Sequence, residues 1–170
     1  MKKVGILPIA AFQRFSYNVH GLNCQFYPSC SNYGAQAIKD YGVLRGSFIA
    51  SDRIVRCNPS ALENHLKSGG EFNPENKRLI DSLHLPQLSE PKKSPLLAAS
   101  LSALIPGAGR MYAGRWFDGV MGLSQFLLYV AITNYTYQND WKAVATISGG
   151  ITLIVYGGEI YGAYRTAKYY

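Results

Sequence analysis

Charged residues are scarce in this 170-residue chain. Lys, Arg, Asp and Glu together make up 16% of it, below the roughly 25% that is usual in soluble domains. The shortage is uneven, because residues 1–93 carry a net charge of +5 whereas no charge occurs from Gly119 to Asn139. This distribution favours a basic, polar N-terminal part followed by a membrane part.

The sequence also lacks the patterns of several functional classes. Its three cysteines are an odd number, which argues against a fully disulfide-bonded secreted scaffold and fits a reducing compartment. No Ser/His/Asp set, phosphate-binding loop or pair of carboxylates in a pocket-forming pattern occurs, so we do not expect an enzyme. Lys2 and Lys3 precede an apolar run that Pro8 interrupts, which indicates a retained helix and not a cleaved signal.

Helical patterns dominate the N-terminal part. We predict a short amphipathic helix from Pro8 to Phe15, with a packing or a membrane-interface role, then helices over 31–41 and 44–56 and a short one over 74–83. One face of the 44–56 helix carries Arg45, Asp52, Arg53 and Arg56. Its three arginines form a basic stripe, which could contact lipid headgroups, a partner protein or water. Residues 85–93 read as a linker.

The C-terminal part, residues 91–170, is predicted to be a membrane domain. A half-length helix covers 95–105, and two spans cover about 116–138 and 143–164, each long enough at about 1.5 Å per residue for a bilayer core. Positive residues precede the first span and follow the second, so we expect both termini in the cytoplasm and the chain in the bacterial inner membrane. The predicted fold class is all-α: a small helical module, residues 1–90, fused to a transmembrane helical hairpin.

The stretch from Cys24 to Pro59 contains many residue types at fixed spacing. It resembles the YidD family, whose pattern is a Cys-Arg-Phe-x-Pro-Thr-Cys-Ser-x-Tyr run, a helix, a Gly-rich bend and an Arg-rich helix ending in Cys-His-Pro. The resemblance covers about residues 5–75. The positions that carry it are Cys24, Phe26, Pro28, Cys30, Ser31, Tyr33, Ala37, Gly42, Gly46, Arg53, Arg56, Cys57 and Pro59.

The resemblance implies an accessory role in the insertion or folding of inner-membrane proteins at the cytoplasmic membrane face, near the YidC insertase. Membrane lipids and nascent membrane proteins would be partners, and neither catalysis nor a cofactor is implied. The chain departs from the family pattern at Gln25, where the family has Arg, and at Asn58, where it has His. The closing Gly-Gly-x-Asp-Pro-Val-Pro motif survives only in part at residues 69–74.

A second resemblance lies in the C-terminal part. Residues 106–119 are similar to the Pro-Gly-x-Gly-x-x-Tyr-x-Gly signature of small bacterial two-helix membrane domains, whose glycines permit a tight bend and close helix approach. The matching positions are Pro106, Gly107, Gly109, Tyr112, Gly114 and Gly119. This match predicts anchoring and no activity.

Three alternatives compete with an insertion factor. Cys24, Cys30 and Cys57 could form a metal or redox sensor with His20 or His65, but zinc usually takes four ligands and the Cys24–Cys30 spacing is unusually long, so we predict no metal. A channel or transporter subunit could use Glu159, although a carboxylate six residues before Arg165 can simply reach the interface. The two helices around Gly42 also resemble a DNA-binding pair, but we expect no nucleic acid because the chain is tethered to a membrane.

Overall fold

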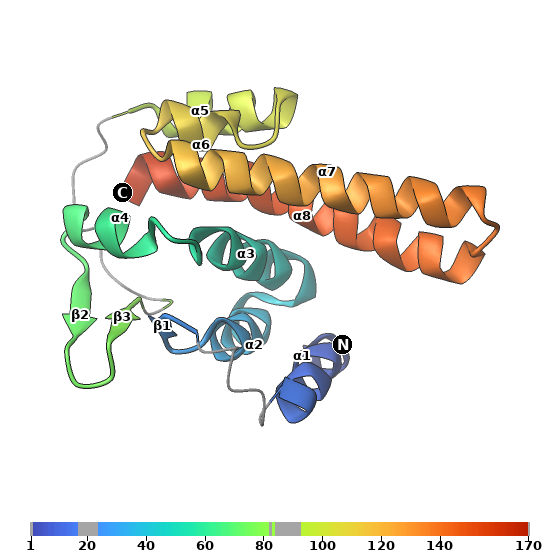
Figure 1. Ribbon diagram of the computed structural model, residues 1–170, viewed down its shortest axis with the longest axis horizontal. Coiled ribbons are helices and arrows are strands. Elements are labelled where there is room, and N and C mark those ends of the chain that lie inside the picture. The colour runs from blue at the N-terminus through green and yellow to red at the C-terminus, as the bar shows by residue number, and fades with distance from the viewer. Residues whose placement is uncertain (1, 17–23, 82, 84–92, 170) are drawn as a thin grey trace. The chain divides into compact units, whose positions relative to one another are not determined.

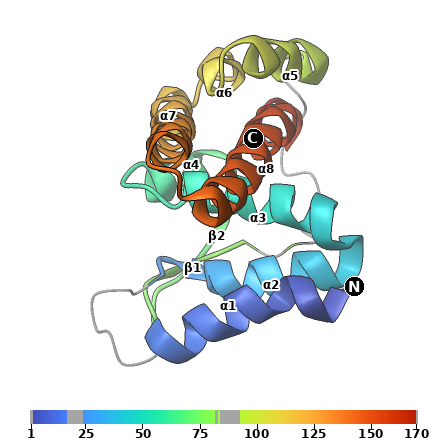
Figure 2. The ribbon, with the colours of Figure 1, turned by 90° about the vertical axis from the view of Figure 1, so that its right-hand side faces the viewer.

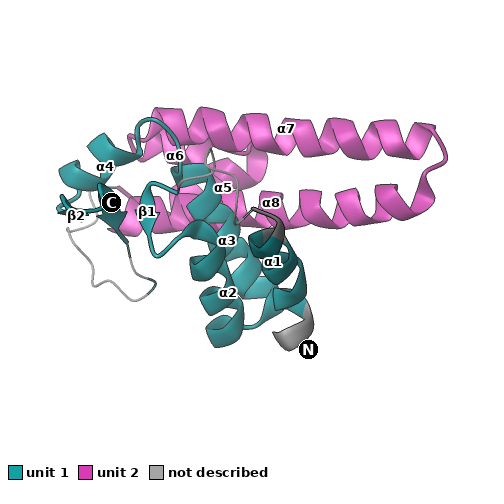
Figure 3. Ribbon diagram, turned by 60° about the horizontal axis from the view of Figure 1, so that its bottom comes forward, with its two compact units in different colours: residues 1–89 teal, residues 90–170 magenta. Residues whose placement is uncertain are grey.

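A computed structural model describes residues 2–16, 24–81, 83 and 93–169. The chain divides into two compact units, residues 1–89 and 90–170 (Figure 3). Each unit has a core of its own: Phe26, Ala61 and Leu79 are buried together in the first, and three alanines are buried together in the second. Helices dominate both units, so the predicted all-α class is confirmed.

Four helices build the described part of the first unit, and α2 and α3 pack against each other within it (Figure 2). The side chain of Ser29 caps α2 by accepting a hydrogen bond from the N–H of Asn32. Gly42, with a φ of +86°, lies between α2 and α3 and permits the sharp turn. A Cβ atom at Gly46 would lie 2.5 Å from the Cα of Ile38, so glycine allows the two helices to pack closely. The helices are α1 (Lys2–Ser16), α2 (Cys30–Tyr41), α3 (Val43–Arg56) and α4 (Ala61–Lys67).

The first helix differs from its predicted bounds. α1 starts at Lys2, so Pro8 lies inside the helix and not in its first turn. The apolar and basic residues before Pro8 therefore belong to the same helix, which packs against α2. Leu7 and Pro8 are exposed on α1, whereas the side chains of Phe12 and Phe15 lie outside the described residues.

A small sheet replaces the short helix that we predicted over 74–83. Its strands are β1 (Phe26–Tyr27), β2 (Glu71–Asn73) and β3 (Arg78–Ile80), in the order β1-β3-β2. β1 and β3 are parallel, and β2 and β3 form an antiparallel hairpin. The prediction fails because Asn73 folds the chain back: its side-chain oxygen accepts from the N–H of Glu75 at 2.9 Å, which is a turn and not a helix start.

The second unit is a helical hairpin with two short helices beside it. The long helices α7 and α8 run side by side and join through a tight turn (Figure 1). Both are long and apolar enough to cross a membrane, and only 17% and 22% of their most apolar stretches are buried within the protein. The hydroxyls of Thr133 and Thr152 lie 3.2 Å apart and link them. The helices are α5 (Pro95–Leu104), α6 (Ala108–Tyr112), α7 (Trp116–Gln138) and α8 (Lys142–Tyr169).

Candidate functional site

Two arginines of α3 lie in a buried ionic network. Oδ2 of Asp81, just after β3, accepts hydrogen bonds from Arg53 and Arg56, each at 2.9 Å. Arg56 also bonds Asp52, one turn earlier in α3, at 3.2 Å. Arg53 donates further to the backbone oxygens of Asp81 and Pro28. The network therefore joins α3 to the sheet and to the segment before α2.

Arg53 is also held between two aromatic rings. Its guanidinium carbon lies 4.2 Å from the centre of the Phe26 ring and 4.3 Å from that of Tyr33, and all three side chains are buried. The predicted basic stripe on α3 is wrong for this reason. Of its three arginines only Arg45 is exposed, while Arg53 and Arg56 are turned into the first unit and cannot contact lipid or a partner there.

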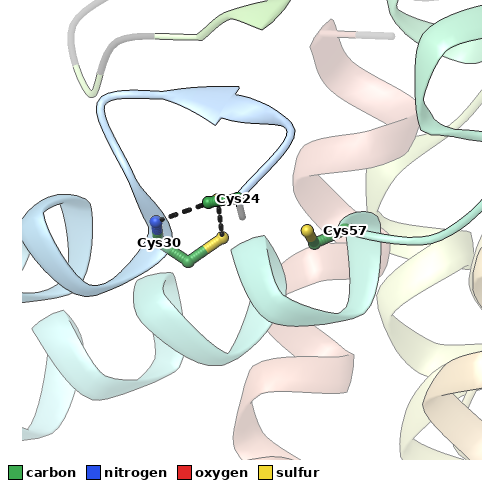
Figure 4. A group of neighbouring side chains, drawn as sticks. All are labelled: Cys24, Cys30 and Cys57. Carbon is green, nitrogen blue, oxygen red and sulfur yellow. Dashed lines mark hydrogen bonds between the residues drawn. The ribbon is translucent and has the colours of Figure 1, made fainter. Parts of the chain in front are cut away.

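The three cysteines come together in the same unit (Figure 4). Cys24 precedes β1, Cys30 is the first residue of α2, and Cys57 follows the last residue of α3. Their sulfur atoms all lie within 4.8 Å of one another, and those of Cys24 and Cys30 are 3.4 Å apart. All three side chains are half-buried and pack against the core formed by Phe26, Ala61 and Leu79.

The contacts within this trio separate the acidities of its thiols. Hydrogen bonds from Cys30 and Cys57 lower the pKa of Cys24, and the backbone N–H groups of Phe26 and Cys30 lower it further. The hydrogen bond with Cys24 raises the pKa of Cys30, and contact with Cys57 and burial act in the same direction. Cys24 therefore loses its proton more readily than Cys30 does.

The two departures from the family pattern are in contact with each other. The side-chain amide of Gln25 donates to the backbone oxygen of Asn58 at 3.0 Å and to the sulfur of Cys57 at 3.6 Å. Asn58 is buried, and its own amide donates to the oxygen of Val55 while its carbonyl accepts from Ser60. The Asn58 side chain thus provides hydrogen-bond partners for the backbone groups of Val55 and Ser60 in the turn from α3 to α4.

Most other predicted motif positions of the first unit support this arrangement. Pro28 supplies a backbone acceptor to Arg53, and the Ser31 hydroxyl accepts from Gln13 of α1 at 3.0 Å. Gly42 and Gly46 shape the α2–α3 bend, as described above, and Pro59 is exposed at the start of the next turn. The motif therefore builds the interior of the unit more than its surface.

An exposed corner lies where α2 meets α3. Tyr41, Val43, Leu44 and Arg45 are exposed there, and the guanidinium of Arg45 lies 4.8 Å from the centre of the Tyr41 ring. A Cβ atom at Gly5 of α1 would contact Val43, so α1 borders the corner. This α2–α3 corner, residues 41–45, combines apolar surface with positive charge, which suits an anionic bilayer surface or an apolar peptide segment.

The glycines of the second motif bring helices together. Cβ atoms at Gly107 and Gly119 would collide with each other's backbone oxygens, and one at Gly109 would collide with the oxygen of Ala98 in α5. Gly107 and Gly114 have φ angles of +87° and +93°. Pro106 is buried, and Tyr112 packs beside the alanine core with Lys93 over its ring. These residues fold α5, α6 and α7 around tight bends.

A buried ion pair fixes the motif to α8. Arg110 of α6 donates from Nε and Nη2 to the two carboxylate oxygens of Glu159, each at 3.2 Å, and both side chains are fully buried. Gly122 of α7 faces Glu159 and leaves space for the carboxylate. We had expected Glu159 to reach the membrane interface near Arg165. Instead it is buried and pairs with Arg110 within the unit.

Sequence reasoning missed the partners in both networks. Asp81 was not singled out, Asp52 was placed only on the charged face of the 44–56 helix, and Arg110 was counted only as a positive residue before the first span. The available signal was charge in apolar surroundings: Arg110 and Glu159 each stand among small and apolar residues, and a lone charge in such a segment needs a partner. Nothing local identified the particular partner, since 49 residues separate this pair.

Known proteins resemble the first unit. Residues 1–65 match the family YidD, described as "Putative membrane protein insertion efficiency factor". A protein so named from Listeria monocytogenes is 39% identical over 85 residues, which are 49% of this chain and 91% of that protein. The chain belongs to the YidD family. Family members from Colwellia psychrerythraea and Oleidesulfovibrio alaskensis are each 44% identical, over 41% and 35% of this chain and 78% and 69% of their own lengths.

The match to the YidD family model ends at residue 65, within the first unit. The residues it covers include the cysteine trio, Arg53 and Arg56. Asp81 lies beyond the residues that the family model matches, and so does the whole of the second unit. No solved structure matches the chain.

Proposed function

We propose that the chain assists the insertion or folding of membrane proteins at the cytoplasmic face of the bacterial inner membrane, as a binding scaffold and not as an enzyme. One observation carries the proposal: a YidD-family unit is joined in one chain to two helices that are long and apolar enough to cross a membrane. The hairpin would keep the YidD unit at the bilayer, where nascent membrane helices emerge.

Charge supports an orientation with both termini in the cytoplasm. Lys93, Arg110 and Arg115 precede α7, and Arg165 and Lys168 lie near the end of α8. The turn between the two helices has no basic residue, and Lys142 begins α8. Positive residues remain on the cytoplasmic side of membrane helices, so the YidD unit would face the cytoplasm.

The α2–α3 corner is the surface that we propose for binding. Leu44 is 68% exposed, and Val43 beside it is 41% exposed, which is costly in water unless another apolar surface covers them. Arg45 adds positive charge that favours anionic lipid. Nascent apolar segments and the YidC insertase are the proposed partners, and the scaffold would hold such segments at the bilayer until they insert.

The ion pair between Arg110 and Glu159 in the second unit argues against a transport function. Glu159 is the carboxylate that a proton or ion relay in α8 would use, but Arg110 occupies both of its oxygens. The pair lies 17 residues from the start of α8, which corresponds to about 26 Å along the helix axis. We therefore propose that it holds α6 against the hairpin near the cytoplasmic edge of the bilayer.

Site-specific crosslinking tests the scaffold. A photoreactive residue in place of Leu44 in the full chain should crosslink to a radiolabelled nascent membrane protein or to the insertase in living cells. The matched position is Phe72, an exposed residue of β2, in the sheet that lies at the other end of α3. Equal crosslinking from Leu44 and Phe72, or none from either, would contradict the proposed binding surface.

A further inference from the structure

The cysteine trio has a geometry that core packing does not require. Three elements, the segment before β1, the start of α2 and the end of α3, place one sulfur each within 4.8 Å of the other two. An ion with metal–sulfur bonds of about 2.3 Å separates its sulfur ligands by about 3.8–4.0 Å. The spacing of the trio therefore accommodates one thiolate-bound metal ion after small side-chain adjustments.

We propose that Cys24, Cys30 and Cys57 together bind one thiophilic metal ion, Zn(II) or Cu(I). Thiolate ligands select these soft or borderline ions over Mg²⁺ and Ca²⁺, which take oxygen ligands. The proposal goes beyond the scaffold function, because it concerns the state of the YidD unit and not what the unit contacts.

The surroundings of the sulfurs suit bound thiolates. The N–H of Cys30 lies 3.4 Å from the sulfur of Cys24, and the Gln25 amide points to that of Cys57. N–H donors of this kind offset the negative charge of metal-bound thiolates and orient them. Cys30 also occupies the first turn of a twelve-residue helix, where the helix dipole favours negative charge.

Among the described residues, the metal-ligand group holds the three cysteines and no further His, Cys, Asp or Glu. His65, which sequence reasoning offered as a fourth ligand, has its Nε2 3.0 Å from the backbone oxygen of Glu71 and its ring edge-on to Phe26. His20 lies outside the described residues. Three sulfurs complete a trigonal Cu(I) site, whereas Zn(II) would take a water or an external group as its fourth ligand.

A disulfide is the competing fate of two of these cysteines. The sulfurs of Cys24 and Cys30 approach to 3.4 Å, so oxidation could join them and leave Cys57 alone. A Cys24–Cys30 disulfide would not explain why the sulfur of Cys57 lies within 4.8 Å of the other two, nor why the Gln25 amide contacts it. A metal ion uses all three sulfurs and also links the ends of α2 and α3, so it should raise the stability of the YidD unit.

Metal titration of the full chain, purified in mild detergent under reducing conditions, tests the site. Zn(II) and Cu(I) are added separately against chelators of known affinity, with stoichiometry from native mass spectrometry and thiol protection from alkylation. Because the chain has only three cysteines, each thiolate–metal signal comes from the trio. We expect one ion per chain, protection of all three thiols and slower hydrogen exchange in α2 and α3.

Matched variants make the result decisive. Cys57→Ser should weaken binding about 100-fold or more, and Gln25→Ala, which keeps every sulfur, about 10-fold. Pro59→Ala, next to the site but exposed and without a donor atom, should bind as the unaltered chain does. Gln25→Ala covers the case in which Cys57→Ser fails to fold.

Three results would overturn the metal site. They are less than one ion per chain at excess metal, equal affinity in the unaltered chain and Cys57→Ser, and a Cys24–Cys30 disulfide that persists in reductant. None of these outcomes bears on crosslinking at Leu44, so the metal site and the scaffold can fail independently.

Discussion

The two units both bury arginine–carboxylate pairs, but they do so in different surroundings. In the YidD unit, Asp81 receives two guanidinium groups, and Arg53 also lies between aromatic rings. In the hairpin unit, Arg110 pairs with Glu159 and also donates to the Thr166 hydroxyl at 3.5 Å, in a space that Gly122 leaves open. The first arrangement positions the elements that carry the cysteines, and the second fastens a short helix to a long one.

The comparison shows what a buried charge can and cannot contribute. Replacing both charged residues by apolar ones also removes the cost of taking the two charges out of water. A buried pair is therefore weak evidence for stability in itself. Removing one partner leaves the other charge buried and uncompensated, which is strongly destabilising. The pairs therefore specify which segments meet, and single substitutions reveal them most clearly.

The largest effect should follow Asp81→Ala, because it leaves two buried arginines without their shared carboxylate. We expect the YidD unit to lose about 3–5 kcal/mol of stability. Hydrogen exchange resolved by peptide in the full chain measures this loss. Glu75→Ala, an exposed acid in the same hairpin, is the control and should change stability by less than about 0.5 kcal/mol. Similar exchange in the two variants would contradict the network.

A somewhat smaller loss, about 3 kcal/mol, should follow Glu159→Ala, since one guanidinium loses its partner. Tryptophan fluorescence measures it selectively, because Trp116 and Trp141 are the two tryptophans of the chain and both lie in the hairpin unit. Asp140→Asn, in the exposed turn, is the control.

Replacing both members of the pair, Arg110→Met with Glu159→Met, should recover most of that loss. If the double variant is less stable than Glu159→Ala, the pair contributes more than mutual neutralisation, and the comparison with the YidD unit must be redrawn.

Substitutions at two glycines distinguish a requirement for close helix packing from a requirement for a positive φ angle. Gly109→Ala should cost about 3 kcal/mol, because its Cβ would collide with Ala98 and Ala163. Gly114→Ala should cost only about 1 kcal/mol, because its φ is positive but nothing lies near the added atom. Thermal unfolding followed by tryptophan fluorescence distinguishes them, and equal losses would show that α5 and α6 do not pack as described.

The smallest effect concerns pH. Burial lowers the pKa of His65, partly offset by its hydrogen bond to the oxygen of Glu71. The folded YidD unit thus binds this proton less readily than the unfolded chain. The contribution of the neutral, buried His65 side chain to stability is therefore complete above about pH 6.5, and it is lost as the pH falls through the pKa of His65 in the folded state. Hydrogen exchange between pH 7.5 and 5 should show this loss, and His65→Leu should reduce it; an unchanged profile would contradict the assignment.

Local patterns predicted much of the fold. The bend at Gly42, the helices on either side of it and the long apolar helices all carry signals within a few residues. The sheet was missed because strands of two or three residues are too short to show alternation. The burial of Arg53 and Arg56 was missed because the sequence of a charged helix face is the same whether that face meets water or a buried carboxylate. Here the carboxylate is Asp81, 25 to 28 residues later in the chain.

The cysteine trio was predictable as a motif but not as a cluster. The spacing of Cys24 and Cys30 fits no common metal pattern, and only the packing of α3 against α2 brings Cys57 to them. Chain folding, not spacing, creates this set of sulfurs.

Membrane insertion in cells tests the central claim most directly. The measurement is protease protection of a pulse-labelled inner-membrane reporter in cells that lack the chain, express it, or express Leu44→Asp, with Phe72→Asp as control. We predict slower insertion without the chain, restoration by the chain and by Phe72→Asp, and incomplete restoration by Leu44→Asp. Equal insertion rates with and without the chain would contradict an insertion function.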